Sequence, residues 1–71
     1  MEVALLCIGD ELLKGSTVNT NLAFLGEKLL ENGIIPKLSL EVPDRDADIR
    51  GALDYAFSRA DIVLTSGGLG P

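Results

Sequence analysis

Three glycines follow an apolar run at the carboxyl end of the sequence, in the segment Gly67-Gly68-Leu69-Gly70-Pro71. The residues before them, Asp-Ile-Val-Leu-Thr-Ser over 61–66, predict a short buried strand that ends at Ser66. Glycine lets a backbone approach a ligand closely and adopt positive φ, so that free amide groups can surround an anion. The segment therefore predicts a phosphate-binding loop, with a plain strand-to-helix turn as the alternative.

Other phosphate-binding and catalytic signatures do not match the sequence. The glycine segment contains no lysine of the G-x-x-x-x-G-K-[ST] kind, and no G-x-G-x-x-G follows the first predicted strand. This disfavours ATPases, GTPases and ordinary dinucleotide dehydrogenases. The chain also contains no histidine, so no Ser-His-Asp arrangement is available for nucleophilic catalysis.

Polar side chains that could contact a ligand lie in three other places. Asp10 and Glu11 follow the first predicted strand, and their hard oxygens could hold a divalent metal together with ligand phosphates. The alternative is that Asp10 caps the next turn while Glu11 is solvated. In Asn19-Thr20-Asn21, helix capping explains one of the three residues, and we predict that Asn21 contacts the ligand. Asp44 is either a helix cap or a site carboxylate.

Composition and charge narrow the classes of partner. With 71 residues the chain holds at most one small domain, and its formal charge of −5 with scattered basic residues argues against nucleic acid as a partner. We also expect no membrane partner, because the apolar run 3–8 is far shorter than the ~20 residues of a membrane span. The single cysteine, Cys7, is predicted to be a buried core residue, which fits a reducing, cytoplasmic setting.

Hydrophobic periodicity predicts the elements of the first half of the chain. The continuous apolar run 3–8 indicates a strand buried on both faces and closed by Gly9, and residues 11–14 suggest one helical turn. A helix should begin at Asn19 or Thr20 and end at Asn32-Gly33, because these residue types are typical of helix caps. Its apolar stripe comprises Val18, Leu22, Leu25 and Leu29.

The second half predicts a strand, a helix and a third strand. Residues 34–42 alternate as a strand, and Pro36 inside it favours an edge position because proline lacks the amide proton. Asp44 or Asp46 should cap the following helix, and Gly51 within that helix indicates a close packing contact. The apolar positions expected to face the core are Ile49, Ala52, Leu53, Ala56 and Phe57.

The order strand–helix–strand–helix–strand predicts an α/β fold with a parallel sheet. If the strand that contains Pro36 lies at an edge, the first strand is central and the third lies on its other side. The loops after the first and third strands then meet at the switch point where open sheets of this kind bind ligands. These loops carry the predicted ligand-binding residues Gly9, Asp10, Glu11, Ser66, Gly67, Gly68 and Gly70.

Several spaced motifs together resemble the N-terminal domain of the CinA (competence/damage-inducible protein A) family, which belongs to the MoaB/MogA-like molybdopterin-binding superfamily. The motifs are Gly9-Asp10-Glu11-Leu12-Leu13-Lys14-Gly15, Val18-Asn19-Thr20-Asn21, Gly33, Val42-Pro43-Asp44 and Thr65-Ser66-Gly67-Gly68-Leu69-Gly70-Pro71. The resemblance covers essentially the whole sequence. It implies a three-layer α/β fold, of which residues 1–71 are expected to be the N-terminal βαβαβ portion, ending after the glycine-rich loop.

The resemblance also implies a function. In CinA-like proteins this domain is linked to metal-dependent hydrolysis of ADP-ribose-type pyrophosphates, and in the molybdenum-cofactor branch it binds molybdopterin. By this likeness Ser66, Gly67, Gly68 and Gly70 match the ligand loop, Asp10 and Glu11 line the pocket, and Asp44 matches an acidic site residue. The family continues beyond the proline with a threonine and aspartates that contribute to ligand or metal binding, so the resemblance assigns no catalytic residue to these 71.

Three functions remain open at this point. The first is a domain that binds a phosphorylated nucleotide or pterin and, with the rest of its fold, hydrolyses pyrophosphates with a divalent metal. The second is a molybdopterin-binding module without hydrolysis. The third is a non-catalytic fragment that self-associates through the uncovered edge of its third strand. Related proteins form homo-oligomers, so the resemblance implies one here, whereas the deamidase domain that many CinA proteins also carry has no counterpart in this sequence.

Overall fold

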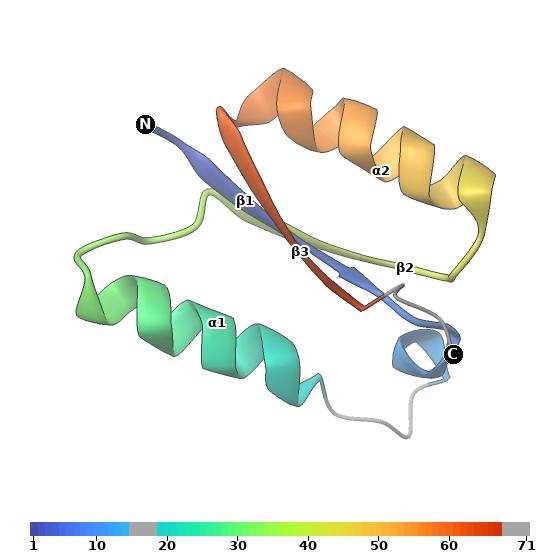
Figure 1. The fold of residues 1–71 in the computed structure, drawn as a ribbon, viewed down its shortest axis with the longest axis horizontal. Helices are drawn as coiled ribbons and strands as arrows, with labels where there is room; N and C mark the ends of the chain where they lie inside the picture. The colour runs from blue at the N-terminus through green and yellow to red at the C-terminus, as the bar shows by residue number, and fades with distance from the viewer. Residues whose placement is uncertain (15–18, 68–71) are drawn as a thin grey trace.

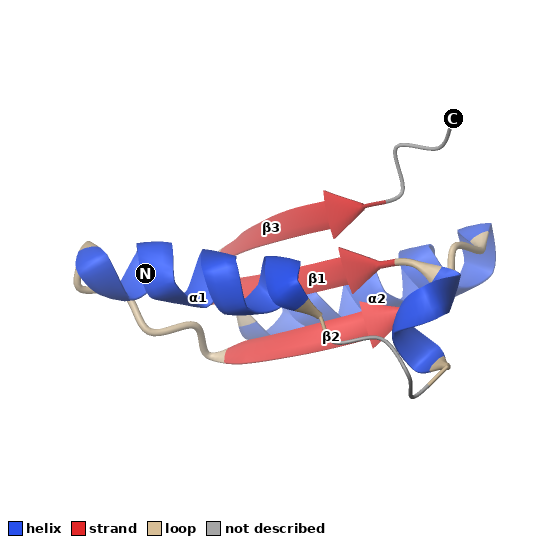
Figure 2. Cartoon of the chain, turned by 90° about the horizontal axis from the view of Figure 1, so that it is seen from below, coloured by secondary structure: helices blue, strands red, loops and turns tan. Residues whose placement is uncertain are grey.

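The computed structural model describes residues 1–14 and 19–67, which form a three-stranded parallel sheet with a helix on each face. The sheet order is β2-β1-β3, so β1 is central, as predicted. Figures 1 and 2 show α1 and α2 on opposite sides of the strands, which gives three layers. The elements in chain order are β1 (Val3–Ile8), the 3-10 turn η1 (Asp10–Leu13), α1 (Thr20–Glu31), β2 (Leu38–Val42), α2 (Asp46–Arg59) and β3 (Ile62–Gly67).

The central strand β1 supplies most of the buried surface. Five consecutive residues, Val3 to Cys7, are buried, because β1 has a strand on each side and a helix over each face. Cys7 is among them, as its place in an apolar run predicts. On the α2 face the core is built from small residues, with Ala4, Ala56 and Ala60 packed together and Leu38, Leu40 and Val63 around them.

The helix α1 begins and ends where its capping residues predict. The Asn19 side chain accepts a hydrogen bond from the Leu22 amide at 3.0 Å, which satisfies one of the free amides of the first turn. Gly33 has a φ of 75°, and its amide donates to the Leu30 carbonyl, so it ends the helix in the left-handed conformation. Of the predicted apolar stripe, Leu22, Leu25 and Leu29 are half-buried, and Val18 lies outside the described residues. No residue over Thr20–Glu31 is fully buried.

The strand β2 differs from its prediction at its start. It begins at Leu38 rather than Ile34, so Pro36 lies before the strand and not inside it. The first amide of this region that bonds to β1 is that of Lys37, which donates to the Val3 carbonyl at 2.8 Å, whereas a proline has no amide proton to donate. The predicted edge position is nevertheless confirmed, and Leu38, Leu40 and Val42 share the less exposed face.

Three predictions about α2 are wrong. Its N-cap is Arg45, without a side-chain capping bond, so neither Asp44 nor Asp46 caps it. A Cβ on Gly51 would meet nothing within 4 Å, so this glycine marks no packing contact. Phe57 is exposed because it lies toward the solvent side of the helix, while Ala52 and Ala56 take the buried face.

Candidate functional site at the carboxyl edge of the sheet

The carboxyl ends of all three strands meet at one edge of the sheet, together with the start of α1 (Figure 2). Because the strands are parallel, each connecting segment returns the chain to the amino end of the sheet before the next strand begins. All three carboxyl ends therefore lie together. The residues after β1, after β2 and at the end of β3 therefore share one edge with Asn19 and Asn21. Open α/β sheets bind ligands at this edge, so the predicted site residues lie in a suitable place.

Asp10 and Asp44, two of the predicted site residues, connect the loops after β1 and β2 through a hydrogen bond. The Asp44 amide donates a hydrogen bond of 3.0 Å to Oδ1 of Asp10, and the Gly9 amide donates to the Val42 carbonyl, also at 3.0 Å. Asp10 therefore bridges toward β2. It does not cap η1, whose N-cap is Gly9 without a side-chain bond. This arrangement gives the Asp10 carboxylate a structural partner and places Asp44 beside it.

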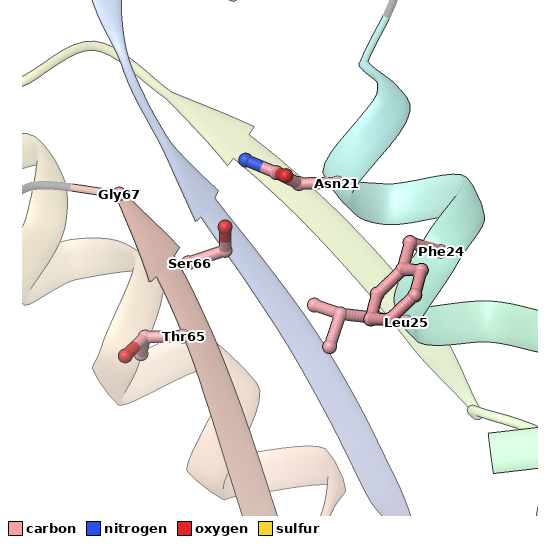
Figure 3. Close-up of a pocket in the computed structure, with 6 residues that line it drawn as sticks. All are labelled: Asn21, Phe24, Leu25, Thr65, Ser66 and Gly67. Carbon is pink, nitrogen blue, oxygen red and sulfur yellow. The ribbon is translucent and has the colours of Figure 1, made fainter. Parts of the chain in front are cut away.

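A cavity of about 340 Å³ lies on the other side of this edge, between α1 and β3. Three predicted ligand-binding residues line it: Asn21, Ser66 and Gly67. Figure 3 shows the Asn21 amide and the Ser66 hydroxyl pointing into the space between helix and strand, with Leu25 below them and Thr65 turned away from α1. The cavity therefore has polar groups near the carboxyl edge and an apolar wall farther along α1.

The two site glycines that the structure describes have different reasons to be glycine. Gly67 has a φ of 87°, and a Cβ on it would overlap the Ile8 carbonyl oxygen of the neighbouring strand. Any side chain at 67 is thus excluded by strain and by contact with backbone. Gly9 has an extended φ of 167°, and its Cβ would meet the flexible Glu11 carboxylate. Gly68 and Gly70 lie outside the described residues.

Asn19 connects the start of α1 to the sheet. Besides capping the helix, its side-chain amide donates a 2.7 Å hydrogen bond to Oε1 of Glu41 on β2. Both functional groups of one side chain are used, one within the helix and one across to the sheet. This pair positions the first turn of α1, and with it Asn21, over the carboxyl edge.

Sequence reasoning missed the other residues that line the cavity, which are Phe24, Leu25 and Thr65. A signal for two of them was present in the spacing. Phe24 and Leu25 follow Asn21 by three and four residues, so they lie on the same face of a helix. Thr65 precedes Ser66, but alternation along a strand directs its side chain to the other face, and the sequence offered no signal for it.

The described residues do not assemble a metal centre. Across residues 1–14 and 19–67, no three Asp, Glu, Cys or His side chains come together as ligands for a metal ion. Asp10 and Glu11 supply two carboxylates, and one of them already accepts the Asp44 amide. The predicted metal role of this pair thus finds no support in the geometry, and we derive no step through a metal.

The architecture is that of an α/β domain with a cavity at the carboxyl edge of its sheet. The sequence matches the family described as "Probable molybdopterin binding domain" over residues 4–71, and the chain belongs to this family. The resemblance to the N-terminal domain of CinA-like proteins is confirmed by relatives that align with nearly all of it. Neither of the described helices has the length and apolarity that a membrane span requires.

Two relatives and one solved structure illustrate the likeness. The chain is 52% identical over 67 residues to a CinA-like protein of Gloeobacter violaceus and 45% identical over 71 residues to one of Geobacter metallireducens. These matches cover 94% and 100% of this chain but only 16% and 17% of those proteins. The crystal structure of the CinA protein from Thermoplasma acidophilum matches with a TM-score of 0.91 at 40% identity, over 99% of this chain and 41% of that one.

Proposed function

We propose that this chain binds a phosphorylated nucleotide or pterin in the cavity between α1 and β3. The observation that carries the proposal is the cavity itself, because Asn21, Ser66 and Gly67, which sequence analysis selected independently, come together there from two different elements. Membership of the molybdopterin-binding family supports a small phosphorylated ligand of this kind. The exposed polar groups of the cavity suit a charged ligand better than a purely apolar one.

Each polar residue has a role in this proposal that its chemistry allows. The Asn21 amide can donate two hydrogen bonds to ligand oxygens, and the Ser66 hydroxyl can donate one and accept others. Gly67 at the end of β3 is followed in sequence by Gly68 and Gly70, and we propose that their backbone amides receive the phosphate. Gly9, Asp10 and Glu11 do not line the cavity, and we propose that they contact a ligand that extends beyond it toward the loop after β1.

Hydrolysis of an ADP-ribose-type pyrophosphate is the activity that the CinA likeness suggests for the complete domain. We propose it as an activity to which these 71 residues contribute ligand contacts, and the divalent metal that the likeness implies would need ligands other than Asp10 and Glu11. The alternative is a molybdopterin-binding module without hydrolysis. Turnover of ADP-ribose that requires added Mg²⁺ would support the first, and tight binding of molybdopterin without turnover would support the second.

The binding proposal is tested by the substitution Gly68→Val. Calorimetric titration of the chain with ADP-ribose and with molybdopterin should give a measurable affinity for one of them, and the variant should lose it while its circular dichroism spectrum stays unchanged. Gly51→Val, on an exposed turn of α2 outside the site, is the matched control because it changes the same residue type in the same way. Unchanged affinity in Gly68→Val would refute the role of the glycine loop.

The third hypothesis, a non-catalytic fragment that self-associates, leads to a separate proposal about assembly. Within the described residues β3 has a strand on one side only, so its other edge offers backbone groups for pairing, and we propose that copies of the chain associate through it. Sedimentation at several concentrations tests this, and a monomer throughout would contradict it.

The buried, unpaired Cys7 supports a reducing, cytoplasmic setting, which localisation of a tagged chain would check.

A further inference from the structure

One aromatic side chain stands at the binding cavity without a role in the function proposed above. Phe24 lines the cavity from α1, yet 56% of the residue is exposed, so the fold does not use it as a core residue. The chain has three aromatic residues, and the other two, Tyr55 and Phe57, lie on α2 away from this cavity. An exposed ring therefore occurs at the point where a ligand would lie.

The position of Phe24 along α1 gives the cavity a direction. It follows Asn21 by three residues, which corresponds to about 4.5 Å of helix rise, away from the carboxyl edge. Asn21, Ser66 and Gly67 therefore form a polar end, and Phe24 with Leu25 forms an apolar end (Figure 3). A ligand that spans both ends needs a polar group on one side and a flat apolar group on the other.

A positive charge lies beside the ring. The ammonium group of Lys28 lies 5.6 Å from the centroid of the Phe24 ring, within the range of a cation–π contact. Lys28 thereby brings a positive charge to the apolar end, where it is only loosely paired with Glu31 at 3.7 Å between exposed side chains. A flat heterocycle with electron-rich ring atoms is compatible with both the aromatic ring and this cation.

We infer that Phe24 is the stacking platform for the planar heterocycle of the ligand, while the phosphate lies toward Ser66 and Gly67. This rests on the proposed function and adds the orientation of the ligand and the residue that selects it. The site should take phosphorylated compounds that carry a planar base or pterin ring. Sugar phosphates without such a ring should bind weakly. Stacking on an aromatic side chain raises affinity by about 5- to 150-fold per base, which is enough to select one class over the other.

The experiment compares ADP-ribose with ribose 5-phosphate, titrated into the chain and into Phe24→Leu, with affinities measured by calorimetry. Loss of the ring should weaken ADP-ribose binding about tenfold and leave ribose 5-phosphate unchanged. Phe24→Tyr should restore the affinity because it keeps the aromatic face. Phe57→Leu is the matched control, since Phe57 is 58% exposed on a helix and does not line the cavity.

The outcomes separate the inference from the function on which it rests. Equal affinity of Phe24→Leu and the original chain for ADP-ribose would overturn stacking and leave the binding function standing. Equal loss for both ligands would also overturn it, because a packing role affects ring-bearing and ring-free ligands alike. If the original chain binds neither these ligands nor molybdopterin, the proposed function fails, and the inference falls with it.

Discussion

The two faces of the sheet are built differently, and the difference separates stability from function. On the α2 face, Ala52, Ala56 and Ala60 are buried against the strands, and small residues let the helix approach the sheet closely. On the α1 face every helix residue stays partly exposed, and two cavities of about 340 and 290 Å³ remain between helix and sheet. The closely packed face holds the fold together, and the open face leaves room for a ligand.

The second cavity strengthens this comparison. It is lined by residues of α1, of β1 and of the β2 region, among them Leu5, Leu22 and Pro36, and it is more apolar than the first. Well-packed interiors leave few voids of this size, so α1 is held by fewer contacts than α2. Elements that bind ligands are commonly drawn from the less stable parts of a fold, which agrees with the position of the candidate site.

Substitution of a core leucine should show the largest difference between the faces. Leu6 is fully buried in β1 and shares its face with Leu40 and the α2 core, so Leu6→Ala should lower the free energy of unfolding by about 3 kcal/mol. Leu25→Ala, beside the open cavity, should cost only about 1 kcal/mol because Leu25 is partly exposed. Urea denaturation at one protein concentration measures both, and equal losses would break the comparison.

Substitution of Gly67 at the end of β3 should give the next largest effect. Gly67→Ala forces a side chain into the Ile8 carbonyl at positive φ and should cost about 2 kcal/mol of unfolding free energy. Gly9→Ala is the matched control, because only the movable Glu11 side chain opposes it and its φ suits any residue. Thermal denaturation compares the two variants. If Gly9→Ala proved as costly as Gly67→Ala, the distinction between the two site glycines would be wrong.

Loss of the α1 cap should have a smaller effect. Asn19→Ala removes both the bond to the Leu22 amide and the link to Glu41, and should lower the free energy of unfolding by about 1 kcal/mol. Glu41→Ala removes only the exposed cross-link and should cost less. Amide hydrogen exchange adds a local readout, since Asn19→Ala should speed exchange in α1 and leave α2 unchanged. Faster exchange in both helices would show that the two faces are not independent.

The smallest change should be a gain. Gly51→Ala and Gly26→Ala place a methyl group where nothing lies within 4 Å, so each should stabilise its helix by about 0.5–1 kcal/mol. Substitution by leucine at the same two positions distinguishes the faces further, because Gly26 lines the second cavity and Gly51 is exposed. Gly26→Leu should therefore stabilise more than Gly26→Ala, whereas Gly51→Leu should add nothing over Gly51→Ala. Equal results at both positions, measured by urea denaturation, would mean that the α1 face has no room to fill.

Local patterns in the sequence determined the elements and much of the fold. The apolar run of β1 and the capping residues Asn19 and Gly33 influence only residues a few positions away in the sequence. Their effects could therefore be predicted without a structure. Pro36 pointed correctly to an edge strand even though β2 begins after it. The motifs around Asp10 and Gly67 were enough to indicate the family before any fold was seen.

The tertiary structure decided the features that depend on distant neighbours. The Asp44 amide donates a hydrogen bond to the Asp10 carboxylate, 34 positions away in sequence, and the N-cap of α2 is Arg45 rather than Asp44. Gly67 must be glycine because Ile8 of the adjacent strand occupies the space of a side chain. Phe24 borders a cavity only because β3 pairs with β1 and brings Ser66 opposite α1. Short-range periodicity contains no information about such pairings, since they arise from packing between elements that the chain joins at long range.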